Sequence, residues 1–340
     1  MTETSSKRSD AITKGAAKAP ARAMLRGAGY SDEQMAQPMV AVVNTWSTVT
    51  PCNMHLADLA EPIRQGLREN GATPVDFNTI VVSDGITMGG EGMRASLISR
   101  EIIADSIELA VKGHSLDAAI ILVGCDKTIP AAAMALARLD IPGLVFYGGT
   151  IMPGQLDGRD LSIQDVFEAV GAHAKGDMSD AELDKVERAA CPGAGACGGQ
   201  FTANTMAMAL AMMGISPMGS GDPPATDSAK RVEAARCGRL AAKLAKEGTS
   251  ARTFLTPASI RNAATAVVAS GGSTNAVLHL PAIAAEAGFA FPIETFDELS
   301  RSVPVITDLK PGGRFLARDL YAAGGVPLFG KRLADAGMLE

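Results

Sequence analysis

Long apolar runs are missing from this 340-residue chain, although 47% of its residues are hydrophobic. No stretch approaches the roughly 18 unbroken apolar residues of a membrane span, and the N-terminus lacks the apolar core of a signal peptide. The 31 basic and 37 acidic residues are mixed, without a long run of one sign. The sequence therefore argues against a membrane or nucleic-acid partner, and we expect a cytoplasmic protein.

Paired cysteine motifs are missing as well. The chain has an odd number of cysteines for its size, which disfavours a disulfide framework. None is arranged as Cys-x-x-Cys, so zinc ribbons and thioredoxin-like redox sites have no support. Reduced thiols or metal ligands fit better, and a metal centre would have to be assembled from distant loops. The five are Cys52, Cys125, Cys191, Cys197 and Cys237.

A buried strand and a helix flank one chemically distinctive turn. Residues 118–123 form a continuous apolar run, which is typical of a strand buried on both faces of a parallel sheet. Gly124 ends this run, residues 131–139 are rich in helix formers, and a second apolar run covers 144–147. This order predicts one βαβ unit.

The turn between that strand and that helix carries a thiol, a carboxylate and an amine. In open α/β sheets, ligands bind beyond the carboxyl ends of the strands. We therefore expect a functional site at three consecutive residues, Cys125, Asp126 and Lys127.

Two earlier apolar runs end in similar turns. Residues 39–43 are followed by a loop that contains Cys52, and residues 79–83 run directly into Asp84. If these runs are parallel neighbours of the strand at 118–123, their following loops converge on one edge of the sheet. Thiols, carboxylates and a lysine would then share one site.

The second half of the chain supplies another cysteine from a glycine-rich loop. Residues 191–199 (CPGAGACGG) precede a predicted helix over 202–213. Their spacing matches neither a Walker loop nor GxGxxG, so the glycines are better explained by backbone wrapping around the Cys197 sulfur than by nucleotide binding. A second glycine-rich turn at 270–275 is either a turn with a helix cap or an anion-binding helix start. The histidines show no ligand spacing.

Each of these side chains has a structural explanation beside its chemical one. Free cysteines are often small buried apolar residues, and aspartates often cap turns and helices. Alternatively, three thiolates would bind an iron–sulfur cluster with one open, Lewis-acidic iron position, and two carboxylates would supply oxygen ligands to Mg²⁺. Lys127 is a surface lysine, a phosphate-binding charge or, once carbamylated, a carboxylate-like metal ligand.

Five long motifs resemble the family of dihydroxy-acid, phosphogluconate and sugar-acid dehydratases, over about residues 22–340. They are TPCNMHL at 50, VSDGITMGGEGMR at 82, GCDKTIPAAAMALARLDIPG at 124, CPGAGACGGQFTANTMAMAL at 191 and SGGSTNAVLHL at 270. The resemblance implies a [2Fe–2S] cluster held by Cys52, Cys125 and Cys197. It also implies Mg²⁺ held by Asp84, Asp126 and a carbamylated Lys127.

The resemblance further implies a reaction, the dehydration of 2,3-dihydroxy-3-methyl carboxylates to 2-oxo acids in valine and isoleucine synthesis. Mg²⁺ would hold the carboxylate and 2-hydroxyl and stabilise the enolate, while the open iron would take the 3-hydroxyl. A small dihydroxy acid is the implied substrate and a homodimer the implied assembly. A sugar-acid dehydratase, a non-catalytic iron–sulfur protein and a nucleotide-binding module remain as alternatives.

The expected fold is α/β, with two flavodoxin-like, three-layer subdomains and largely parallel sheets. Residues 1–21 are expected to be a flexible arm, 22–160 the first subdomain and 161–340 the second, which carries the Cys197 loop.

Two features depart from the family pattern. Gly90 stands where many members carry a histidine, and Gln200 and Phe201 stand where Met-Tyr is common, so local packing is expected to differ. The family also continues into a mainly β domain that supplies a glutamate to Mg²⁺ and a serine base. We therefore expect these 340 residues alone to bear the metal sites without being catalytically complete.

Overall fold

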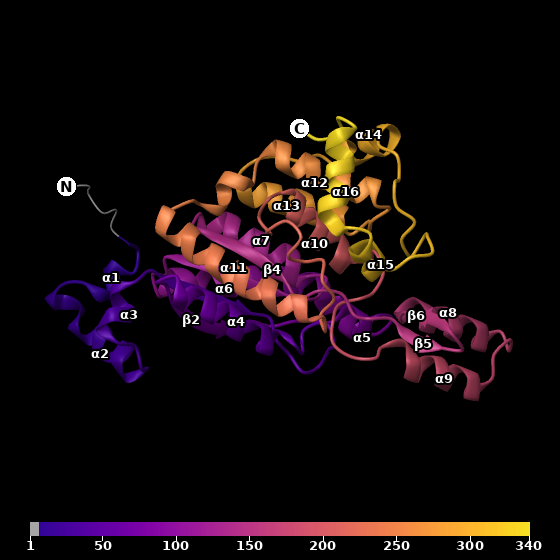
Figure 1. The fold of residues 1–340 in the computed structure, drawn as a ribbon, viewed down its shortest axis with the longest axis horizontal. Coiled ribbons are helices and arrows are strands. Elements are labelled where there is room, and N and C mark those ends of the chain that lie inside the picture. The colour runs from indigo at the N-terminus through magenta and orange to yellow at the C-terminus, as the bar shows by residue number, and fades with distance from the viewer. Residues whose placement is uncertain (1–6) are drawn as a thin grey trace.

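The computed structural model describes residues 7–340 and is built around one parallel sheet, whose strands lie to the left of the centre in Figure 1. Its strand order is β2-β1-β3-β4, the order that begins a flavodoxin-like sheet, and all three strand pairs are parallel. The predicted α/β class is confirmed. The strands are β1 (Met39–Asn44), β2 (Thr73–Asn78), β3 (Ala118–Val123) and β4 (Gly143–Tyr147).

Helices cover both faces of this sheet, and the side chains of β3 alternate between them. Ile120 faces a core shared with α4 (Leu56–Glu69) and α11 (Ser228–Glu247). Ile121 faces the opposite core, shared with α6 (Arg94–Gly113) and α7 (Thr128–Leu139). All six residues of β3 are buried, as the continuous apolar run predicted.

Helix α7 directly follows the predicted site turn and is itself enclosed. Eleven of its twelve residues are buried, because it packs against α6 on one side and α10 and α13 on the other. The turn at 125–127 is therefore held between a buried strand and a buried helix, so it has little freedom to move.

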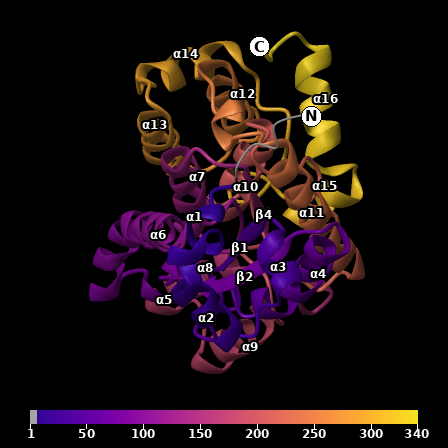
Figure 2. The same cartoon turned by 90° about the vertical axis from the view of Figure 1, so that its left-hand side faces the viewer.

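The second half of the chain differs from the second α/β subdomain that we expected. Apart from isolated bridges, residues 162–340 contain no strand, and the helices that follow residue 200, except α11, form a layer over the α7 side of the sheet (Figures 1 and 2). Alanine and methionine dominate the apolar positions of these segments, and both favour helix over strand. The helices are α10 (Thr202–Met212), η3 (Ala251–Phe254), α12 (Pro257–Ala269), α13 (Ala276–Ala287), α14 (Glu294–Ser302), α15 (Ala317–Ala322) and α16 (Gly325–Asp335).

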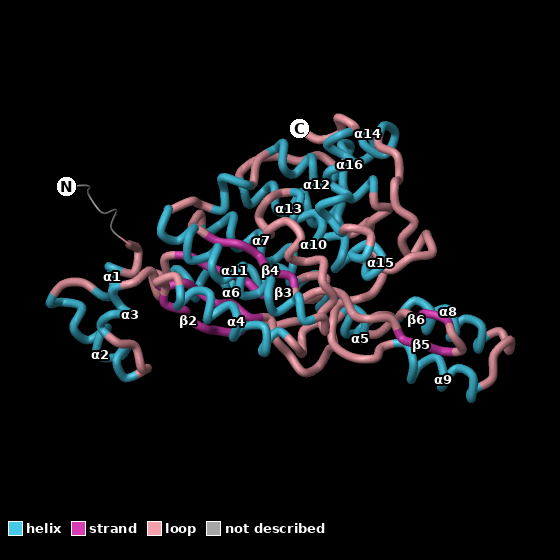
Figure 3. The backbone as a smooth tube through the Cα atoms, viewed as in Figure 1, coloured by secondary structure: helices cyan, strands magenta, loops and turns pink. Residues whose placement is uncertain are grey.

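A small two-stranded unit projects beside the main sheet, at the right of Figure 3. Its strands, β5 and β6, are antiparallel. Two helices pack beside them, each begun by a serine capping box, at Ser162 and Ser179. The elements are β5 (Gly154–Leu156), β6 (Arg159–Leu161), α8 (Ile163–Ala174) and α9 (Asp180–Ala190).

The expected N-terminal arm is only partly described, because residues 1–6 lie outside the described chain. Residues 7–21 are mostly helical, and the buried Ser9 bonds to Asp117 through its N–H at 2.9 Å and its hydroxyl at 2.7 Å. Asp117 also accepts the N–H of Met39, so this segment is fastened to the start of the sheet. The elements are α1 (Asp10–Thr13), η1 (Ala16–Lys18), α2 (Ala19–Gly27) and α3 (Asp32–Ala36).

No helix within residues 7–340 has both the length and the apolar character needed to cross a membrane.

Candidate functional site

Three of the five cysteines meet beyond the carboxyl edge of the sheet. Cys52 lies in the loop after β1, and Cys125 follows β3, at the switch point of the strand order, where ligands bind in such sheets. Cys197 comes from the glycine-rich loop of the second half. All three line one cavity of about 500 Å³, and all three are free cysteines.

The surroundings of Cys52 and Cys125 disfavour free thiolates. A hydrogen bond with Cys125 lowers the pKa of Cys52, but the bond with Cys197 and burial outweigh it, and the pKa is raised. The pKa of Cys125 is raised well above its ordinary value by the bond with Cys52, by burial and by the charge of Asp126. A positively charged group bound between the thiolates would remove this repulsion, so the donor set fits an iron–sulfur cluster.

Main-chain hydrogen bonds hold the Cys197 loop against the first half. The N–H of Gly195 donates to the carbonyl of Pro51 at 2.9 Å, and the N–H of Ala196 donates to the carbonyl of Gly149 at 3.0 Å. Gly195 has φ +128°, and a Cβ there would lie 2.5 Å from the nitrogen of Ile151. Only glycine allows this close approach, which brings the loop alongside Cys52.

The predicted carboxylates and lysine also come together. Lys127 Nζ lies 2.5 Å from Asp84 Oδ2 and 4.0 Å from Asp126 Oδ2, and all three side chains are largely buried. The hydroxyl of Ser96 donates to the other oxygen of Asp84. Burial, followed by the charge of Asp84, raises the pKa of Asp126 to about 7, although Lys127 opposes the shift. The ammonium of Lys127 is therefore the shared ion-pair partner of two neighbouring carboxylates, Asp84 and Asp126.

Asp84 reaches the site by a route that differs from the prediction. The strand lies at Thr73–Asn78 rather than at 79–83, and Asp84 begins the short helix α5 (Asp84–Thr87), before η2 (Glu91–Met93). The N–H of Thr79 still bonds to the carbonyl of Asn44, where β1 ends, so residues beyond it have no strand to pair with. A bond of 3.0 Å between the hydroxyls of Ser83 and Thr50 ties this segment to the Cys52 loop.

No group of three or more His, Cys, Asp or Glu side chains in residues 7–340 is arranged to hold a single metal ion. This agrees with the chemistry of the donors. An iron–sulfur cluster spreads its thiolates over more than one iron, so they need not converge on one point. Asp84 and Asp126 are two carboxylates, and a third protein ligand would have to be of another type, such as a modified Lys127.

The glycine-rich turn at 270–275 also lines the cavity. Its Ser273 shares a hydroxyl contact of 2.9 Å with Thr202, and Asn275 Nδ2 donates to Thr202 at 2.7 Å. The N–H groups of Ser273 and Asn275 are already donated to the side chains of Thr205 and Ser273. The turn therefore uses these two donors in its own packing, which weakens the anion-binding alternative.

The sequence did not single out His279, which lies close behind the carboxylates. It is fully buried, its Nδ1 accepts Arg100 Nη1 at 3.1 Å, and its Nε2 has no partner among the described residues. Burial, with the charges of Arg100 and Lys127, lowers its pKa to about 3, so the ring is neutral. No local spacing could have identified it, because the contacts come from α6 and the turn after β3.

The two remaining cysteines lie outside the main cavity. Cys237 is buried in the core between the sheet and α11. Cys191 is exposed, but it lines a neighbouring cavity of about 260 Å³ together with Cys52 and Cys197. Cys191 is therefore the nearest alternative thiol, and the one that an experiment has to distinguish from Cys197.

Comparison with known proteins agrees with these features. Residues 37–340 match the family described as Dihydroxy-acid/6-phosphogluconate dehydratase N-terminal. Proteins named dihydroxy-acid dehydratase from Koribacter versatilis, Haloarcula marismortui and a strain of Thermus thermophilus are 56%, 52% and 52% identical to the chain, over 100%, 98% and 98% of its length. The chain spans 60%, 58% and 60% of those relatives. It therefore belongs to the dihydroxy-acid/6-phosphogluconate dehydratase family, to whose N-terminal region it corresponds.

Proposed function

We propose that the protein carrying these residues is a hydro-lyase that dehydrates 2,3-dihydroxy-3-methyl carboxylates to 2-oxo acids, a reaction of valine and isoleucine synthesis. The observation that carries this proposal is the shared cavity, which brings thiols and carboxylates from four separate loops to one place. The names of relatives that are 50% or more identical to the chain support the same reaction class.

The donor types suggest how two metal groups would be divided among the residues. The three thiols would hold a [2Fe–2S] cluster, and the two carboxylates with a carbamylated Lys127 would hold Mg²⁺. When bound, these groups would supply Lewis acids for the departing hydroxyl and for the carboxylate end of the substrate. The cluster ligands would be Cys52, Cys125 and Cys197, and the Mg²⁺ ligands Asp84, Asp126 and Lys127.

The cavity walls suit a small branched acid. The volume of about 500 Å³ lies within the usual range of small-molecule sites. Met88, Met93 and Phe167 supply apolar lining, against which a 3-methyl group would pack, and the thiols and carboxylates supply polar lining. A sugar acid carries hydroxyls along its whole length and would leave those that meet the apolar lining unpaired.

We also propose a homodimer. Ile98, Ile102 and Leu109 are exposed on one face of α6, and a partner would remove them from water. Analytical ultracentrifugation tests this assembly, because a protein that stays monomeric at micromolar concentration would contradict it.

The substrate class is tested in the complete polypeptide that carries these residues, by measuring 2-oxo acid formation from 2,3-dihydroxy-3-methylbutanoate and from an aldonic acid after anaerobic cluster reconstitution with Mg²⁺ present. We expect the branched acid to have the higher kcat/KM, by about tenfold or more, because of the unpaired hydroxyls. A preference for the aldonic acid would replace the proposal with the sugar-acid alternative. A loaded cluster without turnover of either acid would favour a non-catalytic iron–sulfur protein.

A further inference from the structure

Cys197 differs from Cys52 and Cys125 in the hydrogen bonds that hold its backbone in place. Residues 191–199 have no helix and no strand of their own, so hydrogen bonds to neighbouring segments must fix the loop, and side chains supply some of them. The carbonyl oxygen of Cys197 accepts two such contacts, from Asn204 Nδ2 at 2.5 Å and from Thr150 Oγ1 at 3.0 Å. Hydrogen bonds to the backbone of the cysteine itself constrain the direction in which its thiol points.

Both the nitrogen and the oxygen of the Asn204 amide are hydrogen-bonded. Asn204 lies in the first turn of α10, and its Nδ2 also donates to the carbonyl of Gly199 at 2.7 Å. Its Oδ1 accepts the hydroxyl of Tyr147 at 2.8 Å. Because an amide has two N–H donors, this arrangement directs both at the Cys197 loop and leaves the oxygen for the phenol.

Tyr147 connects this contact to the central sheet. It is the last residue of β4 and pairs with Val123, two residues before Cys125. Burial raises the pKa of Tyr147 well above its ordinary value, and the charges of nearby thiols raise it further, so the hydroxyl keeps its proton and donates to Asn204. The strand that precedes Cys125 is thus linked, through two side chains, to the loop that carries Cys197.

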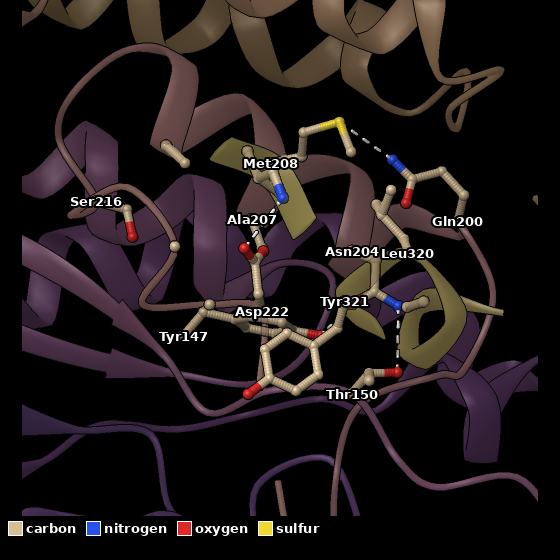
Figure 4. A pocket seen from close by; sticks show the side chains of 15 residues that line it. Tyr147, Thr150, Gln200, Asn204, Ala207, Met208, Ser216, Asp222, Leu320 and Tyr321 are labelled. Atoms are coloured by element: carbon tan, nitrogen blue, oxygen red, sulfur yellow. Dashed lines mark hydrogen bonds between the residues drawn. The ribbon is translucent and has the colours of Figure 1, made fainter. Parts of the chain in front are cut away.

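Figure 4 shows Tyr147, Asn204 and Thr150 around a small pocket of about 40 Å³. The carbonyl oxygen of Tyr147 is held from the other side by Lys230 Nζ at 3.3 Å. Both ends of Tyr147 are therefore bonded, and the phenol has little freedom to release Asn204.

We infer that Asn204 is a positioning residue for Cys197: held by Tyr147, its amide orients the loop so that the thiol faces Cys52 and Cys125. The inference rests on the proposed function only in taking the Cys197 thiol to be a cluster ligand. The orientation itself belongs to the metal-free chain and can be measured there.

The test compares the alkylation rates of two cysteines in one loop. The reduced, metal-free chain is treated with iodoacetamide, and the modified Cys197 and Cys191 peptides are quantified by mass spectrometry over time. Asn204→Leu keeps a similar volume but removes every hydrogen bond of the amide, and we expect the Cys197 to Cys191 rate ratio to rise about tenfold. Tyr147→Phe removes only the phenol bond and is expected to raise the ratio about threefold.

Two controls separate positioning from general loosening. Asn262→Leu removes an amide of α12 that bonds only to Glu340, and it should leave the ratio within about twofold of the wild-type value. If Asn204→Leu does not fold, as judged by circular dichroism, Tyr147→Phe decides the question. A ratio that stays unchanged in the folded variant, or a parallel rise at both cysteines, overturns the inference. If the substitutions raise the ratio but the wild-type chain binds no iron, the inference about Asn204 stands and only the proposed function is overturned.

Discussion

A side chain at position 124 would collide with the backbone of Cys52. A Cβ built on Gly124 lies 2.2 Å from the carbonyl oxygen of Cys52 and 3.1 Å from Asn53 Oδ1. The loop after β1 therefore lies directly against the turn after β3, which is how Cys52 and Cys125, 73 positions apart in the sequence, come to share a cavity. Glycine is required here for space, and the adjoining residue is one of the site cysteines.

Gly124→Ala is expected to lower the free energy of unfolding by about 1–3 kcal/mol, because the backbone of the Cys52 loop must shift to admit the methyl group. Iron bound per chain should fall with it. Urea unfolding and iron analysis measure the two effects. Gly113→Ala is the matched control, since nothing lies within 4 Å of that position. Equal behaviour of the two variants would show that the contact at Gly124 is unimportant.

Mg²⁺ binding is expected to depend on bicarbonate. As an ammonium, Lys127 lies 2.5 Å from Asp84 and competes with a cation for that carboxylate, whereas a carbamylated Lys127 would itself be a ligand. Calorimetric titration of the chain with Mg²⁺ should therefore give tighter binding with bicarbonate present. Lys127→Met should abolish this dependence, and Lys112→Met, on the surface of α6, should retain it. Binding that ignores bicarbonate in the wild type would exclude carbamylation.

Lys230 is a fully buried cation whose Nζ donates to the carbonyls of Tyr147, Ser220 and Gly221 at 3.3, 3.0 and 3.1 Å. Lys230→Met leaves these carbonyls without their donor, and we expect the free energy of unfolding at pH 7 to fall by about 2–4 kcal/mol. Urea denaturation measures the change. Lys243→Met, on the exposed side of the same helix, should be nearly neutral.

The same residue predicts a pH dependence of stability. Burial lowers the pKa of Lys230 from 10.5 to about 7, so between these values the unfolded chain binds more protons than the folded chain. The free energy of unfolding therefore rises with pH in this window, by about 2 kcal/mol between pH 7 and pH 9. Lys230→Met should lack this part of the rise. A difference between wild type and variant that stays constant from pH 7 to 9 would contradict the low pKa.

A strand of the main sheet could be predicted where its sequence pattern is compatible with only one kind of structure. The continuous apolar run at 118–123 is compatible with burial on both faces, and β3 is the result. Residues 73–78 contain Pro74 and Asp76, which an edge strand tolerates and a search for apolar runs overlooks. The more apolar run at 79–83 predicts a strand that the structure does not contain, and Ile80 within it is half exposed.

The meeting of Cys52, Cys125 and Cys197 was predictable in part, since loops that follow parallel strands emerge at one edge. The supports of the site were not. The Tyr147–Asn204 bond joins residues 57 positions apart, and the Arg100–His279 bond joins residues 179 positions apart. Neither pair has a local pattern that differs from an ordinary strand end or helix, so only the packing of the helical half against the sheet reveals them.

The proposed iron–sulfur centre requires three thiols from separate loops to act together, and the iron content and visible absorption spectrum of the anaerobically purified chain test this most directly. Serine replaces each cysteine in turn. We predict that Cys52→Ser, Cys125→Ser and Cys197→Ser each lose the cluster absorbance and most of the iron, while Cys191→Ser and Cys237→Ser retain both. Unchanged iron and absorbance in the first three variants would contradict the proposed centre, and loss in Cys191→Ser with retention in Cys197→Ser would show that the other thiol of the loop is the ligand.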